Sequence, residues 1–168
     1  MNFKTIEDLK KAGFTGFVKI AELWKDSSVI PDEKGVYMVV RKTTEAPVFL
    51  KKGTGGYFKG KEPNVSVETL KENWVSGTCV IYIGKAGSVS GSTTLHKRLE
   101  QYLDFGQGEP AGHYGGRYIW QLKDTENLLF CWKPLKGMEA DPRMEEKNLI
   151  SEFKNQYGGK RPFANLQD

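Results

Sequence analysis

A glutamate on the C-terminal helix has the residue type and position that most clearly need a chemical explanation. In the helix predicted over residues 142–157, Ile150, Phe153 and Tyr157 lie within roughly 40° of the direction of Glu146, at about 100° per residue. Glu146 is therefore expected to point into the protein. An ionised carboxylate is seldom buried without a cation, a metal or a hydrogen-bond network. The pattern leaves two possibilities open, a salt bridge with an arginine or a ligand-binding site.

Arg98 is a candidate partner for that carboxylate. It lies at the edge of an apolar stripe formed by Leu95, Leu99 and Tyr102 on the helix predicted over residues 94–105. Its guanidinium could form the internal salt bridge with Glu146. It could equally face a cleft and hold a phosphate, because the planar fork of donors matches phosphate oxygens.

Five short segments, taken together, carry a family resemblance. In chain order they are Gly35-Val36-Tyr37, Tyr82-Ile83-Gly84, Arg98, Glu146 and Asn165. This order and its local setting resemble the GIY-YIG nucleases, and the surrounding sequence is similar to the nuclease domain of the bacterial excision-repair incision protein. The resemblance covers roughly residues 34–166. One three-residue match would be weak, whereas five ordered elements are specific.

The resemblance implies hydrolysis of a phosphodiester bond with one divalent ion, Mg²⁺ or Mn²⁺. Glu146 would bind the ion, which suits a metal that keeps most of its waters, and Arg98 would bind the scissile phosphate. Tyr37 would be the general base, with Tyr82 and Lys85 holding or polarising the attacking water. A tyrosine has an ordinary pKa of about 10, so this role requires a nearby cation.

Four further residues are candidates for substrate binding. Tyr102 occupies the position, one turn after the arginine, where members of the family carry histidine or tyrosine. Asn165 would orient a phosphate or buttress the site, although asparagine is also common in turns. His113, in a glycine-rich loop beside Arg117, could contact DNA or be an ordinary loop residue. With one other histidine, His96, and no matched spacing, zinc is not expected.

The predicted fold is of the α/β (α+β) class, and the resemblance implies a small three-stranded antiparallel sheet flanked by helices. Residues 35–41 and 79–84 have strand patterns. The third strand is expected at 117–122 or 128–132, two segments that could also pair as a hairpin.

Two segments lie outside that framework. Residues 1–34 predict an N-terminal helical extension with helices at 5–12 and 18–25. Residues 42–78 are rich in glycine and lysine and predict an insertion between the first two motif strands, with a short helix capped by Ser66. The whole chain, 1–168, is expected to be one domain because a core of this size needs no second unit.

Composition adds weaker constraints. The net charge is +4, which permits nucleic-acid binding without arguing for it. Four lysines, Lys51, Lys52, Lys59 and Lys61, share a short stretch with Tyr57 and Phe58, which suits either a DNA-contacting loop or a hairpin that shields an edge strand. Cys79 and Cys131 sit in apolar runs and are predicted to be reduced core residues. No signal peptide or membrane span is apparent, so a cytoplasmic location is expected.

These observations predict a metal-dependent endonuclease acting on DNA, in repair, restriction or mobile-element biology. The alternatives are a non-catalytic DNA-binding module of the same fold and an interaction protein in which Glu146 and Arg98 form an ion pair. DNA specificity would come from residues 42–78, from the loop at 106–117, from a second subunit in a homodimer, or from a separate DNA-targeting partner.

Overall fold

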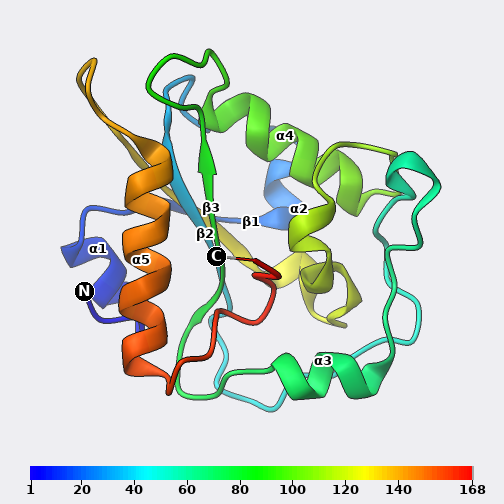
Figure 1. The fold of residues 1–168 in the computed structure, drawn as a ribbon. Helices are drawn as coiled ribbons and strands as arrows, with labels where there is room; N and C mark the ends of the chain where they lie inside the picture. Colours follow the sequence, from blue (N-terminus) through cyan, green and yellow to red (C-terminus); the bar gives the residue numbers. More distant parts are fainter. Residues whose placement is uncertain (168) are drawn as a thin grey trace.

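Four β-strands form one antiparallel sheet at the centre of the computed structural model, which describes residues 1–167 (Figure 1). The strands are β1 (Thr15–Lys19), β2 (Gly35–Val40), β3 (Val80–Ala86) and β4 (Leu129–Pro134). They lie side by side in the order β1-β4-β2-β3. The α+β class is confirmed. The prediction of three strands is wrong, because β1 adds a fourth.

Strand β1 lies mostly between the two helices predicted over 5–12 and 18–25 and takes only Val18 and Lys19 from the second, which forms as the shorter helix α2 (Ile20–Leu23). Gly16 has φ +92 and Phe17 has φ 58, and the pairing register with β4 shifts between Gly16 and Val18. A Cβ atom on Gly16 would lie 2.6 Å from the ring of Trp132, so only glycine allows this close passage. The bulge interrupts the strand alternation, which is why the sequence pattern missed it.

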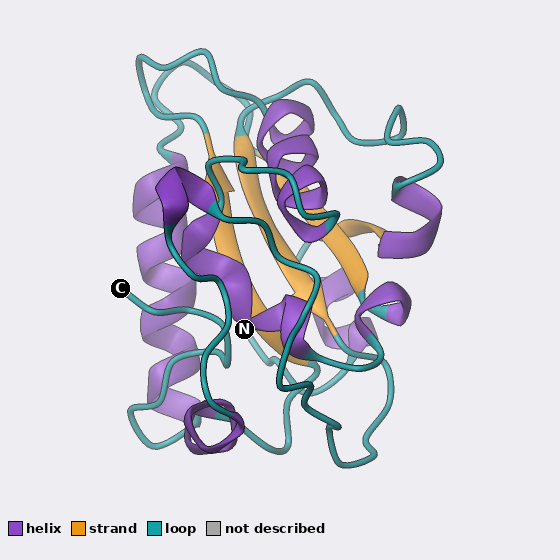
Figure 2. Ribbon diagram, turned by 90° about the vertical axis from the view of Figure 1, so that its right-hand side faces the viewer, coloured by secondary structure: helices purple, strands orange, loops and turns teal. Residues whose placement is uncertain are grey.

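Helices cover both faces of the sheet (Figure 2). The helices are α1 (Ile6–Lys11), α2 (Ile20–Leu23), α3 (Val67–Asn73), α4 (Leu95–Gly106) and α5 (Pro142–Gln156). Helices α1 and α5 pack on the face that carries Val36, Met38 and Val40. Helices α2 and α4 pack on the opposite face, against Tyr37 and Val39. Strand β2 is buried throughout because both of its faces are covered.

The two long helices begin where their capping residues predict. The Thr94 side chain accepts a hydrogen bond from the Lys97 N–H at the start of α4, and the Asp141 side chain accepts one from the Arg143 N–H at the start of α5. The helices predicted over 94–105 and 142–157 are confirmed. Cys79 and Cys131 are free and buried, as expected.

Residues 117–122 do not form a strand, so the hairpin with 128–132 that the sequence left open is absent. They belong mostly to the 3₁₀ segment η2 (Tyr114–Gln121), while β4 supplies the third strand of the motif. Both sides of β4 are already occupied, by β1 and β2. The amide of Gln121 instead donates to the carbonyls of Leu50 and Val65 and accepts from the Val65 N–H.

The 42–78 segment packs along η2. The Leu50 N–H donates to the carbonyl of Gln121, and the Thr54 N–H donates to that of Trp120. Besides α3, which Ser66 caps as predicted, it contains the short 3₁₀ turn η1 (Phe58–Gly60). A further such turn, η3 (Thr125–Asn127), precedes β4. The lysine-rich stretch is therefore not a hairpin along a sheet edge. Its backbone is instead hydrogen-bonded to η2.

Candidate functional site

A cleft of about 420 Å³ is lined by residues of β2, β3, α4, α5 and the loop 87–93. Five of the residues predicted from the sequence line it together: Tyr37, Tyr82, Lys85, Arg98 and Glu146. They come from four different elements, so the fold brings them together from across the chain. The remaining predicted residues, Tyr102, His113, Arg117 and Asn165, do not line the cleft.

The two tyrosines share one face of the sheet because of the β2–β3 register. Tyr37 is opposite Gly84 and Val39 is opposite Tyr82, which places the two rings diagonally, with centroids 6.0 Å apart. A Cβ atom on Gly84 would lie 2.5 Å from Cζ of Tyr37. The glycine of the second motif is thus required for the Tyr37 ring to lie across the neighbouring strand.

Tyr37 is almost fully enclosed, with 1% of its surface exposed, and its hydroxyl lies 2.6 Å from Nε2 of His113. Burial raises the pKa of Tyr37 well above its ordinary value, and the Arg98 charge only partly opposes this shift. Burial, together with Glu146, likewise raises the pKa of Tyr82 to about 12. Neither tyrosine is a phenolate at neutral pH, so a base role for Tyr37 requires that its own proton move elsewhere.

Glu146 is half-buried, and its carboxylate lacks an ion-pair partner in the part of the chain that the structure describes. Within residues 1–167, no cationic group lies within ion-pair distance of its carboxylate. Burial raises the pKa of this carboxyl, while the charges of Lys85, Arg98 and Arg143 act in the opposite direction. The internal Glu146–Arg98 salt bridge, which the sequence left open, is absent from this part of the chain.

The same carboxylate is the acidic group of the cleft that could hold a divalent ion. Over residues 1–167, His, Cys, Asp and Glu side chains nowhere gather in threes. Glu146 is the acidic residue among the cleft-lining side chains. A single carboxylate fits Mg²⁺ or Mn²⁺, because such ions accept water and phosphate oxygens as their other ligands. Its donor set is unsuited to zinc, which prefers nitrogen and sulfur.

The two cations of the cleft are only partly satisfied by the protein. One terminal nitrogen of Arg98 donates to the Gly112 carbonyl at 2.9 Å and to Oε1 of Gln101 at 3.1 Å. Among the described residues, Lys85 Nζ reaches a single acceptor, the Gly87 carbonyl, at 3.4 Å. Donors therefore remain available for an anionic ligand. Gln101 was not predicted, although its place one turn after Arg98 could have indicated it.

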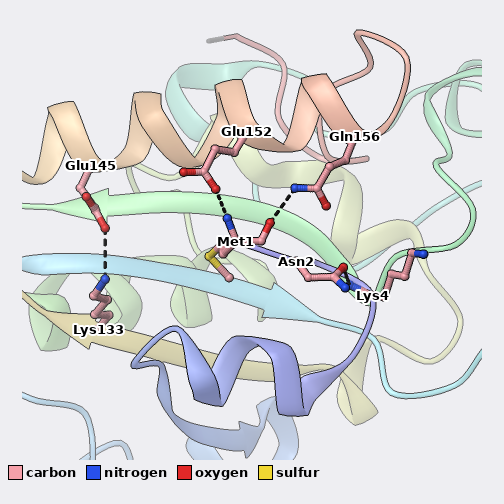
Figure 3. A network of polar contacts seen from close by, with 7 residues as sticks. All are labelled: Met1, Asn2, Lys4, Lys133, Glu145, Glu152 and Gln156. Atoms are coloured by element: carbon pink, nitrogen blue, oxygen red, sulfur yellow. Dashed lines mark hydrogen bonds and ion pairs between the residues drawn. The ribbon is translucent and has the colours of Figure 1, made fainter.

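Glu145, Glu152 and Gln156 of α5 are paired with residues outside the helix (Figure 3), in contrast to Glu146. Glu145 forms an ion pair with Lys133 of β4 at 3.2 Å, and Glu152 pairs with the amino group of Met1. The Gln156 amide donates to the Met1 carbonyl at 2.6 Å. These contacts tie α5 to β4 and to the N-terminal segment and so hold Glu146 in place at the cleft.

Three of the predicted substrate-binding residues are buried instead. Asn165 is 8% exposed, and its amide donates to the Ile83 carbonyl and accepts from the Ile83 N–H, which occupies backbone groups at the free edge of β3. Tyr102 is fully buried, and its hydroxyl donates to the Gly116 carbonyl at 2.6 Å. His113 is also fully buried, so direct contact with a substrate does not suit it.

Arg117 lies outside the cleft and is half-buried against aromatic rings. Its guanidinium lies 4.0 Å from the ring centroid of Tyr114 and 5.2 Å from that of Tyr118. Lys61 of the lysine-rich stretch also lies over Tyr114, at 5.7 Å, and the Tyr114 hydroxyl donates to the Glu62 carbonyl. The segment around Tyr114 thus contacts the lysine-rich stretch. The carbonyl of Gly112, two residues before Tyr114, accepts a hydrogen bond from Arg98.

Comparisons with protein-family models, with curated proteins and with solved structures returned no match to this chain. The GIY-YIG resemblance therefore stays a sequence-based prediction. No helix within the described residues is both long and apolar enough to cross a membrane.

Proposed function

We propose that the protein is a divalent-metal-dependent endonuclease that hydrolyses DNA phosphodiester bonds at this cleft. The observation that carries the proposal is the convergence of Arg98, Lys85 and Glu146 with two tyrosine hydroxyls around one space of about 420 Å³. Two cations and an unpaired carboxylate suit a phosphate and a divalent ion bound together. The resemblance of the same residues to the GIY-YIG motifs supports this function independently of the geometry.

The chain's own residues supply the other requirements of the reaction. Arg98 and Lys85 neutralise and orient the phosphate, because both line the cleft and each has N–H donors without a partner among residues 1–167. Tyr37 and Tyr82 hold the attacking water through their hydroxyls. A divalent ion bound to Glu146 would add positive charge at the phosphate and its leaving oxygen.

A non-catalytic DNA-binding module of the same fold is the second candidate. The cations of the cleft would favour such binding. Glu146 disfavours it, since an uncompensated carboxylate in the same space repels a phosphate. The carboxylate therefore distinguishes the two functions, because it would favour a bound phosphate only in the presence of a divalent ion.

The test is nicking of supercoiled plasmid DNA by the purified protein with Mg²⁺, with Mn²⁺, and with EDTA. We expect relaxed and linear products with either metal and none with EDTA. DNA binding without cleavage in both metals would favour the binding module. Absence of both binding and cleavage would overturn the proposal.

A further inference from the structure

We infer that His113 is the positioning residue and proton acceptor of Tyr37, so that the buried pair acts as one base. This inference rests on the proposed function, since it assigns a role within the same reaction. The sequence alone placed His113 in a loop, as a DNA contact or an ordinary loop residue, whereas the fold places its ring against Tyr37 of the first motif.

The geometry around the histidine ring is well defined. Nε2 of His113 lies 2.6 Å from the Tyr37 hydroxyl, a short distance for a hydrogen bond. The imidazole stacks on the Tyr102 ring, with centroids 3.6 Å apart and an interplanar angle of 3°. Tyr102 is in turn fixed by its hydrogen bond to the Gly116 carbonyl. The stacked ring therefore aims Nε2 at the Tyr37 oxygen.

The groups that face His113 keep its imidazole neutral, so that Nε2 can accept the hydrogen bond of Tyr37. Tyr37 approaches from β2, Tyr82 from β3 and Tyr102 from α4, and Arg98 of α4 contributes a positive charge. Burial, and then Arg98, lower the pKa of His113 well below its ordinary value. In the described chain Nδ1 has no hydrogen-bond partner, so no neighbour fixes the tautomer from that side.

The proton transfers balance without a charged tyrosine. The oxygen of the attacking water forms a bond to phosphorus, and the bond from phosphorus to the leaving oxygen breaks. The proton of the water passes to the Tyr37 oxygen as the Tyr37 proton passes to Nε2 of His113. The resulting imidazolium, whose lowered pKa favours release, returns its proton through Tyr37 to solvent, and the departing oxygen takes a proton from water. Tyr37 passes the proton on without becoming a buried phenolate, the form that its raised pKa disfavours.

Two substitutions separate this role from simple packing. His113→Phe keeps an aromatic ring for the stack on Tyr102 but has no nitrogen. His113→Gln keeps a group that can hydrogen-bond to Tyr37 but cannot accept its proton at neutral pH. Each variant is expected to lower kcat for plasmid nicking about 100-fold with KM little changed. His96→Gln, on the outer side of α4, is the control and should cleave like the unaltered protein.

A second measurement does not depend on activity. The chain has two histidines, so ¹⁵N-histidine labelling gives two imidazoles, and His113→Phe assigns them. We expect the proton of His113 on Nδ1, with Nε2 accepting from Tyr37. Tyr37→Phe should then shift the Nε2 resonance of His113 and leave His96 unchanged.

The outcomes are distinguishable. A proton on Nε2 in the unaltered protein, or full kcat in either folded His113 variant, would overturn the inference and leave the endonuclease proposal intact. An unaltered protein that shows the expected imidazole spectrum but cuts no DNA would overturn the proposed function and, with it, the catalytic role of His113.

Discussion

Two cavities of the protein, each lined by an arginine, differ in how far the surrounding residues pair the charged side chains that line them. The larger, of about 720 Å³, lies between α1, residues 41–47 and residues 74–79. There the Arg41 Nε pairs with Asp124 at 2.8 Å, and its NH1 donates to the Glu45 carbonyl at 2.5 Å. The guanidinium also lies 5.7 Å from the ring centroid of Trp74.

The smaller cavity, the cleft with Arg98, leaves its charges incompletely paired. Glu146 has no ion-pair partner within the described chain, and Lys85 has one long contact there. A buried charge that the fold does not satisfy lowers stability, and it is tolerated where a ligand supplies the missing partner. Unsatisfied charge, rather than cavity volume, therefore indicates the functional site.

The largest expected effect is the loss of cleavage in Glu146→Ala, by about 10³-fold or more, because the metal ligand is removed. The protein should remain folded. Glu145→Ala is the matched control on the same helix, since it removes only the half-buried pair with Lys133, and it should cleave nearly normally. Plasmid nicking and thermal unfolding measure both properties. An inactive Glu145 variant beside an active Glu146 variant would show that the wrong carboxylate was chosen.

Arg41→Ala should lower stability and leave cleavage unchanged, the opposite of Glu146→Ala. Removing the buried arginine leaves Asp124 without its partner, so the free energy of unfolding should fall by about 3 kcal/mol in urea titration. The kcat of the protein that remains folded should not change. A specific decrease in kcat with normal stability would make the larger cavity part of the active site and would remove the distinction between the two cavities.

Tyr37→Phe removes one hydroxyl from the cleft. We expect kcat to fall about 100-fold while DNA affinity, measured by gel shift without metal, stays close to that of the unaltered protein. Arg98→Ala, by contrast, should weaken both binding and turnover, because it removes a phosphate-binding group. Unchanged cleavage by the Tyr37 variant would exclude Tyr37 as the base.

The lysine-rich stretch provides a smaller effect on binding. Replacing Lys51, Lys52, Lys59 and Lys61 by Gln should weaken DNA binding and flatten its dependence on salt, by about 0.9 in log–log slope for each phosphate that the protein no longer neutralises. Cleavage should persist at low salt because the cleft is unaltered. An unchanged slope would assign the stretch to structure and favour residues 106–117 as the DNA-contacting segment.

The smallest effect concerns stability and pH. Since the pKa of Glu146 is raised in the folded protein, ionisation of this residue opposes folding. This loss of stability is absent below the ordinary glutamate pKa of about 4.3. It grows as the pH rises from there to the raised pKa of Glu146 in the folded protein. Glu146→Gln should therefore have a higher Tm than the unaltered protein at pH 7.5 without metal, and an equal Tm near pH 4. A lower Tm at pH 7.5 would show that the carboxylate is already stabilised within the protein.

Local sequence determined the features that depend on neighbours along the chain. The apolar positions of α5 fixed the inward direction of Glu146, and the Thr94 and Asp141 caps fixed where the two long helices begin. Such patterns act over one to four residues, so the sequence alone contains the information. The same holds for β2, whose apolar and β-favouring residues predict a strand in any buried context.

Tertiary structure decided everything that depends on partners distant in sequence. Strand β1 pairs with β4 because Gly16 can pass close to the Trp132 ring. Residues 117–122 form mostly a 3₁₀ segment because the Gln121 amide donates hydrogen bonds to carbonyls of the 42–78 segment. His113 meets Tyr37, 76 positions away, only after η2 packs on the sheet. No local pattern can specify that contact, because its energy comes from burial and stacking between segments that are independent until the chain has folded.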